Sequence, residues 1–214
     1  MLKIMEQPGL GVGTIMTTLA LLTGTPVHPL PILYILSSAR WVYGTDRYLD
    51  NKTEDTPEAL AGALLLSNLI LWYKDLTPLI APEILCVLAY PEFKRHFPIL
   101  KPFYVGFFWS GAITIVPHLI ANVDIDYEQT QAIAMLASGV SNTADIEDVD
   151  DDIENGIYTI PSRYGIRVTR AISAGLFIGS AYKSIIPHAI PQTRRNMNKV
   201  IAPRVWHYRN LVFR

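Results

Sequence analysis

The sequence has little charge and almost no cysteine. Only 17% of the 214 residues are charged, whereas a soluble domain carries about 25%, and half of the residues are hydrophobic. This deficit favours contact with lipid over a fully solvated surface. The net charge of −1 gives no general attraction to nucleic acid, so we expect no nucleic-acid partner. The single cysteine, Cys86, excludes an intrachain disulfide.

The long apolar stretches lack the alternating pattern of membrane β-strands, and a chain that crosses a bilayer must otherwise form helices. Seven such stretches recur, at residues 10–22, 29–44, 59–73, 76–90, 102–121, 130–142 and 172–190. Several are shorter than the roughly 20 residues that cross a bilayer, but residues 59–73 contain no charge at all. We predict an all-α, polytopic membrane helical bundle of about seven transmembrane helices, with residues 1–190 as one domain and 191–214 as a basic tail.

The long charged joints follow the second, fourth and sixth stretches, at residues 46–58, 91–101 and 145–170. Joints that follow even-numbered spans lie on one side of a membrane, so these segments are expected to share one face. Within the stretches, Pro82, Pro117 and Pro187 predict kinks. We interpret Glu83 as a residue at the end of a span and His118 as locally hydrogen-bonded rather than catalytic.

The third joint lacks any cation where its acids are densest. Seven of the ten residues from Asp145 to Glu154 are acidic, and none is Lys or Arg. Carboxylates repel one another at close range, so the run predicts an external cation. Spacings of three and seven place Asp145, Asp148 and Asp152 on one stripe of a helix that Gly156 and Pro161 would end. The remaining acids of this run before Ile153 are expected to meet solvent: Glu147, Asp150 and Asp151.

Hard divalent ions such as Mg²⁺ take carboxylate ligands and often bridge to substrate phosphates. The first joint offers a similar arrangement, because Asp46 and Asp50 lie four residues apart on one helical face. Arg47 between them has a planar fork suited to phosphate. A solvated helix end with an Asp–Arg pair is the alternative interpretation.

The second joint begins with Tyr90 and carries adjacent cations, Lys94 and Arg95. In isolation these cations are typical of side chains that anchor a span at the interface. Together, however, the three motifs resemble the UbiA superfamily of intramembrane prenyltransferases. The segment from Asp145 through Gly156 and Thr159 to Pro161 is similar to the family's second aspartate motif, and Gly106 lies where the family has a glycine-rich fifth helix. The resemblance covers residues 29–189.

The resemblance implies that Mg²⁺, held between the two aspartate motifs, binds the diphosphate of a polyprenyl donor whose prenyl group passes to a hydrophobic acceptor. The implied metal ligands are Asp46, Asp50, Asp145, Asp148 and Asp152. The cations implied to neutralise the leaving diphosphate are Arg47, Lys94 and Arg95, with Arg163 as a weaker candidate. Tyr90 or Tyr48 would stabilise the allylic cation through its ring face.

Two departures from the family pattern favour an alternative. Val42 and Tyr43 stand where the family's first motif begins with Asn-Asp, and the chain after Pro161 is shorter than in the family. A second copy or a partner would then complete the helical wall. A catalytically decayed relative that acts as a partner subunit is therefore the second hypothesis. The third hypothesis is a soluble or peripheral isoprenoid synthase. The fourth is an ion transporter, because acidic pairs also line the paths of cations.

Overall fold

The computed structural model describes residues 14–18, 28–49 and 56–189, and this part of the chain is helical without β-strands. The all-α prediction is therefore confirmed. The main helices are α2 (Pro29–Leu49), α3 (Pro57–Tyr73), α4 (Ile80–His96), α5 (Lys101–Ser110), α6 (Val116–Ala121), α7 (Tyr127–Ala144) and α10 (Ile166–Ala189). Two short helices, α8 (Val149–Glu154) and α9 (Ile160–Tyr164), join α7 to α10. Short helical turns, Thr77–Leu79, Pro98–Leu100 and Gly111–Ile115, complete the order.

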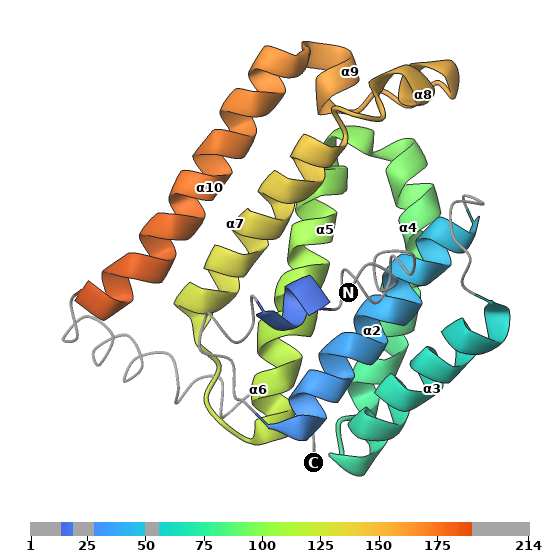
Figure 1. Ribbon diagram of the computed structural model, residues 1–214, viewed down its shortest axis with the longest axis vertical. Helices are drawn as coiled ribbons and strands as arrows, with labels where there is room; N and C mark the ends of the chain where they lie inside the picture. Colours follow the sequence, from blue (N-terminus) through green and yellow to red (C-terminus); the bar gives the residue numbers. More distant parts are fainter. Residues whose placement is uncertain (1–13, 19–27, 50–55, 190–214) are drawn as a thin grey trace.

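The long helices run up and down in an antiparallel order (Figure 1). Helix α7 lies between α5 and α10, and α2 packs on α3 at the other side of the bundle. The core joins α2, α3, the segment from α5 to α6, and α7 through nearly inaccessible side chains: Tyr34, Ile35, Leu71, Ile113, Ile120 and Ile133. Burial of each of these side chains stabilises the fold by about 1.5–3 kcal/mol.

Each predicted stretch from residue 29 onward coincides largely with a helical segment, whereas the first one and the basic tail lie largely or wholly outside the described residues. Among the described helices, the segment Pro98–Ala121 is long and apolar enough to cross a membrane, and half of its most apolar window is buried. Helix α3 is apolar but shorter. One such helix is weak evidence of a membrane protein, because the core helix of a soluble protein passes the same test. The seven-span topology stays a prediction.

The predicted break at Pro117 coincides with a change of helix type. Residues Gly111–Ile115 form a π-helical turn, in which the Val116 N–H donates to the Gly111 carbonyl. Proline has no N–H and its ring crowds the carbonyl four residues earlier, so the chain widens just before it. Pro82 instead lies in the first turn of α4, where proline is tolerated, and Pro187 lies close to the end of α10.

Small residues let α5, α7 and α10 approach closely. A Cβ atom built on Gly106 would lie 2.0 Å from the Ser138 hydroxyl oxygen and 2.4 Å from the Ala134 carbonyl oxygen, so only glycine fits there. A Cβ on Gly139 of α7 would lie 2.6 Å from the Phe177 ring of α10. Close contacts of this kind are typical of membrane helix pairs. They fix α5 against the antiparallel α7 and so bring the start of α5 beside the end of α7.

Candidate functional site

The three aspartates of the acidic run do not lie on one helix, so that prediction is wrong. Helix α7 ends at Ala144, Asp145 is its C-cap, and α8 begins four residues later with Asp148 at its N-cap position. The C-terminal end of a helix carries partial negative charge, which disfavours further acids, whereas the N-terminal end favours them. The break therefore moves Asp150, Asp151 and Asp152 into the first turn of a new helix.

The end of α8 agrees in part with the end predicted from Gly156 and Pro161. Gly156, with a φ of +70°, follows the C-cap of α8 and ends it as predicted. Pro161 lies in the first turn of α9 and opens that helix rather than ending one, so this half of the prediction is wrong. Glu147, Asp150 and Asp151 are exposed, which confirms that they meet solvent.

A lysine from α5 neutralises the first aspartate of the run. The Lys101 Nζ lies 2.5 Å from the Asp145 Oδ1, and the two residues are only 8% and 2% exposed. The other oxygen of this carboxylate, Oδ2, is buried and has no hydrogen-bond partner among the described residues. The external cation predicted from the acidic run is thus replaced, at one oxygen, by an internal ammonium group. No local pattern predicts this pair, because its members are 44 residues apart.

The three aspartates of the motif form one electrostatic group with this lysine. Burial raises the pKa of Asp145 above its ordinary value, Lys101 opposes this shift, and Asp152 and Asp148 add to it. Lys101 in turn interacts with all three carboxylates. The buried Asp152 Oδ2 accepts a hydrogen bond from the Thr159 hydroxyl at 2.9 Å, and Thr159 is inaccessible to solvent. Thr159 therefore positions a motif carboxylate, although it was not among the predicted site residues.

The donor set fits one kind of magnesium site and not another. No three acidic, His or Cys side chains converge closely enough to hold a metal ion within residues 14–18, 28–49 and 56–189, so this part of the chain contains no dedicated three-ligand site. Magnesium, however, is usually held by one or two carboxylates, waters and substrate phosphates. Carboxylate chemistry and the unpaired Asp145 Oδ2 fit that second kind of site.

The first aspartate motif lies at the end of α2. Asp46 and Arg47 are both partly buried, and the Arg47 guanidinium carbon lies 5.9 Å from the centroid of the Tyr43 ring. The Arg47 Nε is buried, and its N–H donates to no partner among the described residues. Tyr43 therefore supplies an aromatic ring beside this arginine. Asp50 lies outside the described residues, so the predicted pairing of Asp46 with Asp50 stays a prediction.

The cations of the second motif, Lys94 and Arg95, lie in the last turn of α4. Tyr90 and Lys94 are partly buried, and the Tyr90 ring lies 5.8 Å from the ring of Tyr104 on α5. The Tyr104 hydroxyl also donates to the Cys86 carbonyl, which fixes α4 against α5. Arg95 is exposed and pairs with Glu92 at 3.6 Å, a surface pair of little energetic weight.

Arg163, the weaker candidate, lies on α9. It is exposed, and its guanidinium carbon lies 5.8 Å from the centroid of the neighbouring Tyr164 ring. His118 bonds locally, as predicted, since its Nδ1 lies 2.6 Å from the Thr114 carbonyl oxygen one turn earlier. The described contacts of Arg163 and His118 therefore do not join either residue to the acidic cluster.

Glu83 joins α4 to α2. It lies in the first turn of α4, as expected for the end of a span, but it is only 8% exposed. Its carboxylate accepts hydrogen bonds from the Tyr34 hydroxyl at 3.0 Å, the Ser38 hydroxyl at 3.0 Å and the Trp41 indole N–H at 3.1 Å. Sequence reasoning did not find this contact, which positions the helix that bears the second motif.

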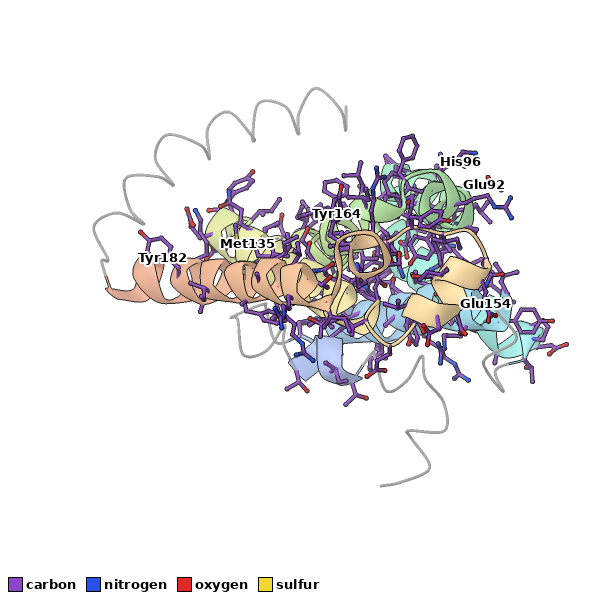
Figure 2. All side chains as sticks on the ribbon, turned by 90° about the horizontal axis from the view of Figure 1, so that it is seen from above. Glu92, His96, Met135, Glu154, Tyr164 and Tyr182 are labelled. Atoms are coloured by element: carbon purple, nitrogen blue, oxygen red, sulfur yellow. The ribbon has the colours of Figure 1, made fainter. Side chains whose placement is uncertain are left out.

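The ends of α2, α4 and α7 point toward the same end of the bundle, where α8 and α9 also lie (Figure 1). Seen from above this end, Glu92 and His96 of α4 and Glu154 of α8 lie toward one side of the molecule, and Tyr182 of α10 lies toward the other (Figure 2). The arrangement agrees with the expectation that the three charged joints share one face.

No protein-family model matches the chain, and no curated protein or solved structure matches it either. The functional argument therefore rests on the residues and their geometry.

Proposed function

We propose that the chain is a multi-pass membrane prenyltransferase with a UbiA-like fold that transfers a prenyl group from a prenyl diphosphate to a hydrophobic acceptor with the help of Mg²⁺. The observation that carries the proposal is the buried ion pair of Lys101 and Asp145, within electrostatic reach of Asp148 and Asp152, at the end of the bundle where α2 and α4 also end. Acidic and basic groups together at one face suit a metal-bound diphosphate.

The exterior of the helices supports a membrane location. Large apolar side chains are exposed on several helices, including Leu65 and Trp72 of α3, Leu88 of α4, Phe107 of α5 and Ile178 of α10, each at least 63% accessible. A soluble monomer rarely exposes apolar surface so widely. Lipid around about seven transmembrane helices accounts for this surface without a further partner.

The aspartates are proposed to hold the metal from two sides, with Asp145, Asp148 and Asp152 on one and Asp46 and Asp50 on the other. Bound there, Mg²⁺ would act as a Lewis acid that stabilises the negative charge developing on the diphosphate. The carboxylates would thus orient the diphosphate relative to the helical bundle. Thr159 would hold Asp152 in place through its hydrogen bond.

The basic residues would stabilise the same developing charge. Arg47, Lys94 and Arg95 lie in the last turns of α2 and α4, and cations held at that end would stabilise the negative charge that develops on the diphosphate as the allylic C–O bond ionises. Tyr90 presents an aromatic ring at this end, and a ring face stabilises an allylic cation. The apolar bundle would exclude water until the acceptor reacts.

The proposal is tested by prenyl transfer in membranes, with prenyl diphosphates of several lengths, a panel of hydrophobic acceptors, and product detected by mass. We expect Asp148→Ala to abolish transfer while the protein stays folded and inserted. Asp150→Ala is the matched control, because this neighbouring aspartate is exposed, and it should retain activity. Full activity of Asp148→Ala would exclude the proposed role of the acidic cluster.

A second candidate is a catalytically decayed relative that serves as a partner subunit. Two observations favour it: Tyr43 replaces a family carboxylate and packs on Arg47, and no three-ligand metal group occurs in the part of the chain that the structure describes. Binding of a prenyl diphosphate separates the two functions. The enzyme requires Mg²⁺-dependent binding, and a chain that binds no prenyl diphosphate at any Mg²⁺ concentration would be a partner subunit.

A further inference from the structure

Lys101 is not among the residues proposed to hold the metal or the diphosphate, yet it forms a buried ion pair with the first aspartate of the acidic cluster. It is the first residue of α5 and is 8% exposed. Its ammonium group contacts one oxygen of Asp145, and the other oxygen, Oδ2, is buried without a described partner. Asp145 is thus half satisfied by the protein itself, and its second oxygen is left without a partner among the described residues.

The pair makes metal binding by itself unfavourable. A divalent cation at Asp145 would compete with the ammonium group of Lys101 for the carboxylate. Displaced from Asp145, the buried ammonium group of Lys101 would lose its contacting carboxylate, and a buried charge that loses its partner is strongly destabilising. A diphosphate that arrives with the metal removes this penalty, because its oxygens accept charge-assisted hydrogen bonds from the ammonium group.

The flexible side chain of lysine suits such an exchange. Its ammonium is a point charge with three donors on a four-carbon stem, so it can change partners by rotation about side-chain bonds. The backbone of α5 is held against α7 by the close approach at Gly106. Lys101 is therefore expected to move its side chain and not its helix.

We propose that Lys101 couples the binding of a divalent metal to the binding of a diphosphate, an inference that rests on the proposed function. Lys101 holds Asp145 in the ligand-free protein and releases it to the metal when diphosphate oxygens accept the ammonium group. The cluster then selects a metal–diphosphate complex over the free metal ion.

The test measures Mn²⁺ binding to the detergent-purified full chain by electron paramagnetic resonance, with and without inorganic pyrophosphate as the probe. In the wild-type protein we expect pyrophosphate to tighten Mn²⁺ binding by roughly tenfold or more, within the usual range of coupling between two ligands. In Lys101→Met, Mn²⁺ alone should bind more tightly than to the wild type, and the effect of pyrophosphate should shrink to about twofold or less by the same reasoning.

Lys101→Arg provides a second measurement that keeps the charge and therefore does not depend on the folding of Lys101→Met. An arginine fork can bind both oxygens of a carboxylate at once. It should therefore hold Asp145 more firmly and weaken Mn²⁺ binding both with and without pyrophosphate.

Equal Mn²⁺ affinity and equal pyrophosphate dependence in the wild type and in the folded Lys101 variants would overturn the inference. So would a wild-type protein that binds no Mn²⁺ in the presence of pyrophosphate. The test of prenyl transfer is independent of this test of coupled binding. Coupled binding without prenyl transfer would refute the transferase and keep the role of Lys101, whereas prenyl transfer without coupling would refute only that role.

Discussion

The contact between α5 and α7 gives the sharpest structural prediction, because the position of Lys101 against Asp145 depends on it. The change is Gly106→Ala. The added methyl group would lie 2.0 Å from the Ser138 hydroxyl and 2.4 Å from the Ala134 carbonyl oxygen. The hydroxyl can rotate away, but the carbonyl belongs to the backbone of α7. Because a Cβ atom essentially never lies within 3.0 Å of a heavy atom from another part of the chain, the two helices must separate or tilt.

Overpacking of this kind typically destabilises a protein by about 1–3 kcal/mol. For a chain of this size, each kcal/mol lowers the melting temperature by roughly 2–4 °C. We therefore expect Gly106→Ala to melt several degrees below the wild type. Gly62→Ala on α3 is the matched control, since its added methyl group would meet nothing within 4 Å. Alanine is favoured over glycine in a helix by up to about 1 kcal/mol, so this control should be neutral or stabilising.

The assay is thermal unfolding in detergent, followed by tryptophan fluorescence. Trp109 is a suitable probe, because it is buried on the same helix three residues after Gly106. Gly106→Ala should also weaken pyrophosphate-dependent Mn²⁺ binding, since the start of α5 moves away from Asp145. A Gly106→Ala protein as stable as the wild type would refute the close approach of α5 and α7 and, with it, the geometry that pairs Lys101 with Asp145.

Three further predictions follow from the site and the surface. Addition of EDTA should stop prenyl transfer and added Mg²⁺ should restore it; turnover that is insensitive to chelation would count against the metal. Glu83→Ala leaves three buried donors of α2 without their acceptor, at about 1–3 kcal/mol for each, so its melting temperature should fall steeply, whereas Glu92→Ala at an exposed position should change it little. In fractionated cells, the chain should remain in the membrane pellet after carbonate extraction, and its release would favour a peripheral protein.

The helices could be predicted from the sequence because they depend on local pattern. The apolar stretches predicted helices that overlap α4, α7 and α10. The charged joints predicted that the three motifs lie at one end of the bundle, in agreement with Figure 1. The break at Asp145 was missed because the spacing argument considered only which face a residue occupies. It left out the unfavourable position of further acids at the C-terminal end of α7.

The partners of the buried charges could not be predicted in the same way. Lys101 and Asp145 are 44 residues apart, and Tyr34 and Glu83 are 49 residues apart. Both pairs depend on how helices pack, and no local pattern records that packing. Lys101 looked like the end of a polar joint, and Glu83 looked like the end of a span. Thr159, by contrast, stood within the quoted motif, seven residues after Asp152, so attention to hydroxyl groups near the acids would have found it.

The two buried carboxylates of this bundle differ in a way that separates structure from binding. Glu83 has three donors from α2 on its two oxygens, so it has little capacity for another ligand. Asp145 has one donor, Lys101, and an unpaired second oxygen. Burial of an unpaired carboxylate oxygen destabilises a folded chain. We propose that a ligand completes the coordination of this oxygen, and that the aspartates and cations at the same end of the bundle favour a metal–diphosphate complex as that ligand.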